Sequence, residues 1–119
     1  MNIENAVEKY FAMWNEHDPV ARRAVISELW TNDAVSADPM SSVAGHEAID
    51  AMVAGIQTNM PPHRFERLGE IAAHADRVLY YWQMIGDDSE VMVAGLDAVR
   101  IASDGRFADL AGFFGPTPA

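Results

Sequence analysis

The pair Pro61-Pro62 divides the chain into two parts with different hydrophobic periods. Before it, apolar residues recur every three or four positions, as on amphipathic helices. From His63 onward they follow extended patterns in runs separated by turn signals, as in consecutive antiparallel strands. Helices first and strands afterwards predict an α+β domain. Because three helices can cover only one face of such a sheet, a curved sheet wrapped around them would enclose a concave space.

Each predicted element has its own local signals. Asn2 and Asp18 are suited to cap the first two helices, and Pro19 fits the first position of the second helix. Pro39 should end the first strand at Asp38, because proline lacks the amide donor of a sheet. The pattern predicts helices over about 2–16, from Pro19 to near Trp30, and from about 46 to Met60, strands over 33–38, 63–73, 77–86, 90–102 and 106–114, and a loop over 41–45.

Composition narrows the class of protein. We expect one domain over residues 1–115 with a flexible tail at 116–119, since the chain has 119 residues. A formal net charge of -10 disfavours nucleic-acid binding. The absence of cysteine excludes disulfides and thiolate chemistry. Neither a signal peptide nor a membrane-spanning run is visible, so we expect a cytoplasmic protein without a membrane partner.

Asp97 interrupts an apolar strand face. In the stretch 91–101 it alternates in phase with Val93, Gly95 and Val99. A buried carboxylate is costly unless it is paired, hydrogen-bonded or protonated. Asp97 therefore lines a pocket, or pairs with an arginine such as Arg100, or lies where a bulge has changed the face.

Two further polar side chains are candidates for the same cavity. Tyr10 lies on the apolar stripe of the first helix and Asp38 at a strand end. A hydroxyl and two carboxyls can perform acid-base chemistry if one carboxyl stays ionised as a base and the other stays protonated as a donor. Context assigns the base to Asp38 and the donor to Asp97. The alternatives are a core aromatic at Tyr10 and a turn-forming aspartate at Asp38.

Aromatic residues are candidate walls of a small-molecule site, although such residues can also be plain core. Val78, Tyr80, Trp82 and Met84 form the more apolar face of their strand, so Trp82 should point inward. The candidate substrate-binding residues are Trp14, His63, Tyr80, Trp82 and Phe113.

No cofactor or metal is expected. His46 and Asp50 have helical i, i+4 spacing, but no third ligand has a convincing position. No glycine-rich phosphate loop or nucleophile elbow is present. Arg22 and Arg23 read as part of a solvated helix face.

Five short segments carry a resemblance to a known superfamily. They are 10–18 (YFAMWNEHD), 33–39 (DAVSADP), 45–49 (GHEAI), 104–106 (DGR) and 112–115 (GFFG). In order and spacing the chain resembles the nuclear transport factor 2-like superfamily, in particular its SnoaL-like and ketosteroid-isomerase-like proteins. The resemblance implies an α+β cone, a barrel-like curved, mostly antiparallel sheet around three N-terminal helices, with a deep pocket and a homodimer formed through the open sheet face.

The resemblance also implies roles for three residues. In ketosteroid isomerases an aspartate base shuttles a proton, while a tyrosine and a protonated aspartate bind the enolate oxygen. Matched by motif, these roles fall on Asp38, Tyr10 and Asp97. Trp14, His63 and Trp82 look bulkier and more polar than the walls of a steroid pocket, so a smaller or different ligand is expected.

The leading hypothesis is therefore a cofactor-independent enzyme, of the isomerase or SnoaL-like polyketide cyclase type, acting on a small apolar or carbonyl-containing molecule. The rival is a non-catalytic protein that binds a small apolar ligand. A hydrolase adding water to an epoxide would need an arginine bridging two carboxylates, and Arg100 faces away from Asp97 by strand parity.

Overall fold

The structure, a computed structural model, describes residues 2–115 and contains the three predicted helices. They are α1 (Ile3–Asn15), α2 (Pro19–Leu29) and α3 (His46–Asn59). The side chains of Asn2 and Asp18 cap α1 and α2 by accepting hydrogen bonds from the amides of Asn5 and Ala21. Within the described part of the chain, no helix combines the length and apolar character needed to cross a membrane.

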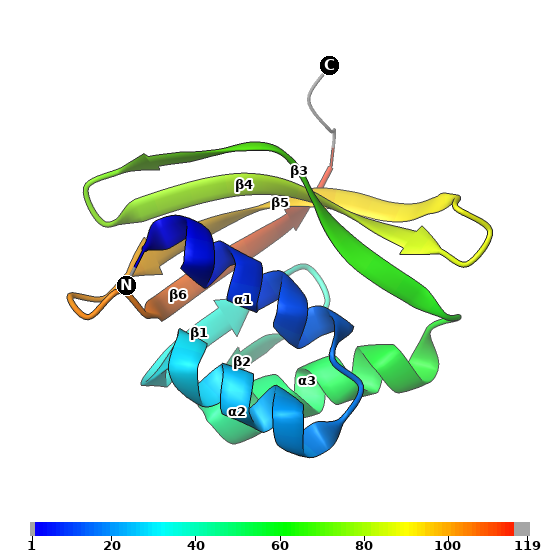
Figure 1. Ribbon diagram of the computed structural model, residues 1–119, viewed down its shortest axis with the longest axis horizontal. Helices are drawn as coiled ribbons and strands as arrows, with labels where there is room; N and C mark the ends of the chain where they lie inside the picture. The colour runs from blue at the N-terminus through cyan, green and yellow to red at the C-terminus, as the bar shows by residue number, and fades with distance from the viewer. Residues whose placement is uncertain (1, 116–119) are drawn as a thin grey trace.

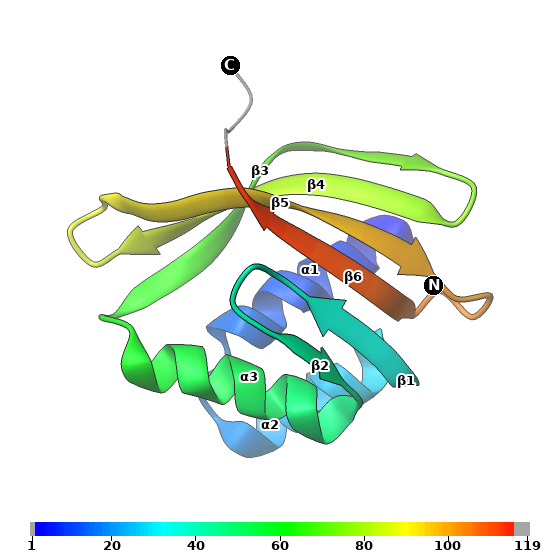
Figure 2. The same cartoon turned by 180° about the vertical axis from the view of Figure 1, so that it is seen from behind.

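The strands form one curved, unclosed sheet in the order β2-β1-β6-β5-β4-β3 (Figure 1). Neighbouring strands are antiparallel except β1 and β6, which are parallel and lie side by side in Figure 2. The predicted α+β fold with a mostly antiparallel sheet is confirmed. The strands are β1 (Trp30–Ala37), β2 (Ser42–Ala44), β3 (His63–His74), β4 (Arg77–Gly86), β5 (Val91–Ile101) and β6 (Phe107–Phe114).

Two local predictions are corrected by the structure. The loop expected over 41–45 contains the short strand β2, which pairs with the end of β1. Three residues are too few to show an alternating pattern, so no strand signal is visible over this segment. Strand β1 also begins earlier than predicted, at Trp30, directly after α2. The predicted tail at 116–119 lies outside the described residues.

The helices cover only the concave face of the sheet, and α1 crosses that face (Figure 1). Their contact with the sheet is largely aromatic. The ring of Tyr10 packs 5.8 Å from Tyr80, 5.8 Å from Phe107 and 6.1 Å from Trp30, measured between centroids. On β4 the residues predicted to face inward, including Tyr80 and Trp82, are buried. Beside this packing, a cavity lies between α1, α3 and the sheet.

Arg22 is buried, contrary to the solvated position read from the sequence. Only 3% of its surface is exposed. Its Nε donates to Asp50 Oδ1 on α3 at 2.7 Å, and its guanidinium also donates to the Glu16 carbonyl and to Gln57 Oε1, at 3.0 and 2.9 Å. A buried guanidinium is tolerated when its donors are satisfied in this way. The arginine ties α2 to α3 and to the end of α1.

Candidate functional site

Asp38 and Asp97 lie in one row across the concave face of the sheet. On β5, Asp97 pairs with Tyr80 of β4 on one side and with Gly112 of β6 on the other. Asp38 directly follows Ala37, which pairs with Ala111. A Cβ atom on Gly112 would lie 3.0 Å from Asp97 Oδ1 and 3.3 Å from Asp38 Cβ. The glycine therefore lets the two aspartates approach one another.

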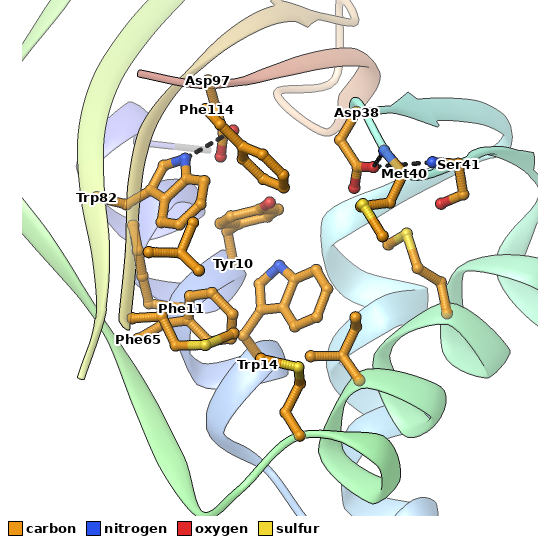
Figure 3. A pocket seen from close by; sticks show the side chains of 15 residues that line it. Tyr10, Phe11, Trp14, Asp38, Met40, Ser41, Phe65, Trp82, Asp97 and Phe114 are labelled. Atoms are coloured by element: carbon orange, nitrogen blue, oxygen red, sulfur yellow. Dashed lines mark hydrogen bonds between the residues drawn. The ribbon is translucent and has the colours of Figure 1, made fainter. Parts of the chain in front are cut away.

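Tyr10 reaches this row from the opposite side of the cavity. It is buried on α1, and its ring lies between the two aspartates in Figure 3. Burial raises the pKa of Tyr10 well above its ordinary value, and the charges of Asp97 and Asp38 raise it further. The hydroxyl of Tyr10 therefore stays protonated and can donate a hydrogen bond. The structure brings all three predicted acid-base residues to one cavity.

Asp97 is 2% exposed, and its surroundings favour the protonated acid. Trp82 Nε1 donates to Asp97 Oδ1 at 3.1 Å. Among the described residues, Asp97 Oδ2 and the Tyr80 hydroxyl have no partner in good hydrogen-bond geometry. Burial raises the pKa of Asp97 to about 7, although the nearby groups of Tyr80, Tyr10 and Trp82 partly oppose the rise. Near neutral pH this carboxyl is present in both protonation states.

Gly95 explains how Trp82 reaches Asp97. Trp82 of β4 pairs with Gly95 of β5, and the indole ring lies against the Gly95 backbone. A Cβ atom on Gly95 would lie 2.7 Å from the Trp82 ring and 2.1 Å from the Phe113 carbonyl oxygen. Real Cβ contacts are essentially never that short, so any larger residue would displace the indole or the strand. Gly95 therefore shapes the site. The sequence pattern showed only that Gly95 lies on the same strand face as Asp97.

Asp38 forms a turn and also faces the cavity. Its Oδ1 accepts hydrogen bonds from the amides of Met40 at 2.7 Å and Ser41 at 3.0 Å. These two bonds are typical of an aspartate that stabilises a turn, which is the alternative role stated above for Asp38. Both engage Oδ1, which leaves Oδ2 as the oxygen to act on a ligand. Figure 3 shows this carboxyl at the edge of the cavity, with Tyr10 between it and Asp97.

The cavity has a volume of about 260 Å³ and mostly apolar walls. Helices α1 and α3, strands β3 to β6 and the turn between β1 and β2 contribute the wall. The lining residues are Tyr10, Phe11, Trp14, Asp38, Met40, Ser41, Met52, Ile56, Met60, Phe65, Trp82, Met84, Val93, Asp97 and Phe114.

The predicted substrate-binding residues are not all on this wall. Trp14 and Trp82 line it, whereas Tyr80 is buried behind Asp97. His63 lies outside the lining, with Nδ1 2.8 Å from the Pro61 carbonyl oxygen. Phe113 is 51% exposed and points to the other face of the sheet. Its neighbour Phe114 lines the cavity instead.

Sequence reasoning missed the contribution of α3. Met52, Ile56 and Met60 recur at four-residue spacing, which indicates an apolar stripe on one face of a helix. In the structure this stripe faces the cavity rather than another layer of side chains. The spacing revealed the inward face of the helix, but nothing local in the sequence distinguishes a cavity wall from a packed core.

The two residues with metal-ligand spacing have separate roles. His46 Nε2 lies 2.9 Å from the Trp30 carbonyl oxygen, and Asp50 pairs with Arg22. Over residues 2–115 no three histidine, aspartate or glutamate side chains are grouped as a metal site would require.

Comparison with solved structures identifies the fold as nuclear transport factor 2-like. A provisionally named isomerase of the SnoaL-like family from Agrobacterium tumefaciens is 27% identical, with 94% of this chain and 96% of that chain covered and a TM-score of 0.89. A protein of unknown function from Exiguobacterium with this fold is 20% identical over 94% and 99% of the two chains, with a TM-score of 0.74. A provisionally named polyketide cyclase from Sinorhizobium meliloti is 23% identical over 91% and 93%, with a TM-score of 0.72.

The chain belongs to the SnoaL-like domain family, whose profile matches residues 7–110. The resemblance found from short sequence motifs is thus confirmed. Among curated proteins, none matches this chain.

Asp97→Asn should change how stability depends on pH. Because the pKa of Asp97 is about 7 in the fold, against 3.8 ordinarily, the folded chain keeps this proton at pH values where the unfolded chain has lost it, and the wild type loses stability as the pH rises from about 4 to about 7. Between about pH 5 and about pH 8 the loss attributable to Asp97 should be roughly 2 to 3 kcal/mol. Urea unfolding of the wild type and of Asp97→Asn at the two pH values measures this change in the free energy of unfolding. The other titrating groups are the same in both proteins, so an equal pH dependence would contradict a raised pKa of Asp97.

Trp82→Phe should raise the pKa of Asp97 further. The indole N–H bond to Oδ1 favours the ionised carboxylate, while the phenyl ring keeps most of the bulk that excludes water. Carbon-13 NMR titration of the Asp97 carboxyl measures the shift. Trp30→Phe is the matched control, because the Trp30 indole donates to Met13 Sδ instead. A fall in the pKa of Asp97 in Trp82→Phe would mean that water entry outweighs the lost hydrogen bond.

Proposed function

We propose that this protein is a cofactor-independent isomerase or cyclase that abstracts a proton from a carbon next to a carbonyl group. The observation that carries the proposal is the convergence of Asp38, Asp97 and Tyr10 on one apolar cavity. The provisional names of the relatives from Agrobacterium tumefaciens and Sinorhizobium meliloti, isomerase and polyketide cyclase, agree with this chemistry.

In the proposed reaction Asp38 is the general base. Its Oδ2 takes the proton, and the electron pair of the broken C–H bond moves onto the carbonyl oxygen to form an enolate. The Tyr10 hydroxyl and the protonated Asp97 donate hydrogen bonds to that oxygen, where negative charge develops. An isomerase returns the proton from Asp38 to a different carbon. A cyclase instead lets the enolate carbon attack a second carbonyl of the same molecule, and Asp38 returns the proton to the oxygen of that carbonyl, which becomes a hydroxyl.

The environments of the two carboxyls support this division of roles. Asp97 is buried, and its pKa of about 7 keeps a large neutral fraction that can donate. Asp38 is only partly buried and is oriented by two backbone amides, so its second oxygen is placed to act as the base. Positioned general bases contribute about 10² to 10⁴ in rate.

Asp38→Asn should remove proton abstraction and leave the turn intact. The amide oxygen of asparagine can accept the same bonds from Met40 and Ser41, but it is not basic. With the bicyclic ketone 2-tetralone in deuterated water, we expect exchange of the hydrogens next to the carbonyl to fall at least about 100-fold. NMR measures the exchange, and the same spectra measure binding, which should change little. Undiminished exchange in Asp38→Asn would refute this assignment of the base.

A non-catalytic binding protein is the second candidate, and the turn geometry of Asp38 favours it. Two short amide bonds to Oδ1 give that aspartate a structural role without any chemistry. Under this alternative the Asp38→Asn, Asp97→Asn double variant retains the ligand, and the wild type exchanges no ketone hydrogens above the buffer rate. The same NMR experiment therefore separates the two candidates.

We also propose that a second copy of the chain covers the outer face of the sheet. The three helices occupy the concave face (Figure 1). The outer face carries two cross-strand rows of mainly apolar residues. The rows are Leu79–Ala98–Ala111 and Tyr81–Leu96–Phe113. Apolar patches on an exposed sheet face are typical of interfaces between subunits.

Leu96→Lys should convert this dimer to a monomer, because the charge would be buried at the centre of the interface. Light scattering coupled to size exclusion measures the mass, and circular dichroism checks the fold. We expect twice the chain mass for the wild type and one chain mass for the variant. Glu90→Lys, an exposed change outside the two rows, is the control and should stay dimeric. A monomeric wild type would contradict the proposal.

A further inference from the structure

The size of the cavity limits the number of rings that a ligand can bury. Its volume is about 260 Å³, at the small end for ligand sites, which span roughly 300 to 1,000 Å³. An apolar cavity of about 150 Å³ suffices for benzene. A cavity less than twice as large therefore accommodates about two fused rings, and a ligand of four rings would leave much of its surface outside.

The wall is suited to a flat ring system. Trp14, Phe65, Trp82 and Phe114 form a continuous series, with successive ring centroids 4.9, 5.8 and 6.2 Å apart. Aromatic faces of this kind favour stacking or edge contacts with another ring. Methionines supply a flexible remainder of the wall, and their side chains adapt to the outline of a ligand. These are Met40, Met52, Met60 and Met84.

The charges of the wall exclude anionic ligands. None of the described residues that line the cavity is lysine, arginine or histidine, and two of them are aspartates. The chain as a whole carries a formal net charge of -10. A carboxylate or phosphate would enter without a counter-charge and next to Asp38, which is unfavourable in an apolar site.

The polar groups are gathered at one end. Figure 3 shows Asp38, Asp97 and the Tyr10 hydroxyl on one side of the cavity, with Trp14, Phe11 and Phe65 on the other. Asp97 Oδ2 is buried without a hydrogen-bond partner in good geometry among the described residues. A hydrogen-bonding oxygen of a ligand at that end would give this atom a partner.

We propose that the substrate is an uncharged ketone or enone of one or two fused rings, whose carbonyl oxygen lies against Tyr10 and Asp97 and whose rings lie against Trp14, Phe65 and Trp82. This substrate class rests on the proposed function, because the proton donors of the reaction place the carbonyl oxygen. It goes beyond that function by setting the size, shape and charge of the molecule.

Three probes separate the size, charge and polarity requirements. The uncharged two-ring phenol 2-naphthol mimics the enol, 2-naphthoate carries the same rings with a negative charge, and estradiol is a four-ring phenol. Binding is measured near pH 6 from the indole N–H resonances of the nitrogen-15-labelled protein. The chain has three tryptophans, of which Trp14 and Trp82 line the cavity and Trp30 is buried elsewhere in the core. Trp30 is thus an internal control.

We expect 2-naphthol to shift the Trp14 and Trp82 resonances and to leave Trp30 nearly unchanged. Naphthoate and estradiol should bind at least about tenfold more weakly. Tyr10→Phe, which removes one donor and keeps the ring, should weaken 2-naphthol binding about tenfold. If naphthoate binds as tightly as 2-naphthol, the charge requirement is wrong. If estradiol binds as tightly, the size limit is wrong. If 2-naphthol shifts only the Trp30 resonance, or none of the three, the ligand does not bind at this site.

The outcomes also separate this inference from the proposed function. If 2-naphthol binds as expected but 2-tetralone undergoes no exchange that depends on Asp38, the ligand class stands and the catalytic function fails. If exchange depends on Asp38 but four-ring ketones react faster than 2-tetralone, the function stands and the size limit is wrong.

Discussion

The buried carboxyl of Asp97 is the constraint on which the arrangement of the site depends. A carboxylate taken out of water is unstable unless hydrogen bonds or a proton neutralise it. Here one indole N–H reaches it, and two tyrosine hydroxyls lie near it, yet its pKa is still raised to about 7. The apolar wall therefore does more than hold a ligand, because it keeps this acid partly protonated and able to donate a hydrogen bond.

Two glycines make that environment possible. Gly95 gives the Trp82 ring room to lie against β5, and Gly112 leaves the space between Asp38 and Asp97 without a side chain. Neither glycine carries a chemical group, so neither has the signature of a site residue. Their role is visible only when the cross-strand neighbours are known, since the atoms that a Cβ would meet belong to other strands.

Features that depend on neighbouring residues in the sequence could be predicted, whereas features that depend on contacts between distant segments could not. Asp97 stood out because a charge on an apolar strand face is a local, period-two signal. The burial of Arg22 depends on Asp50 and Gln57 of α3, which the pattern of α2 cannot show. Phe113 lies on the outer face and Phe114 on the inner face because the register shifts near Phe107: both Phe107 and Leu110 are buried although they lie an odd number of residues apart. Alternation counted from one end of β6 therefore gives the wrong face at the other end.

The parallel pairing of β1 with β6 has a consequence for biosynthesis. It joins Ala37 to Ala111, so the strand that ends at Asp38 acquires this neighbour only after nearly the whole described chain has been translated. Until β6 is made, Trp30 lacks the ring of Phe107, which packs 5.5 Å from it between centroids. The cavity lacks Phe114 until the same stage, so this part of the core and this part of the wall are completed together.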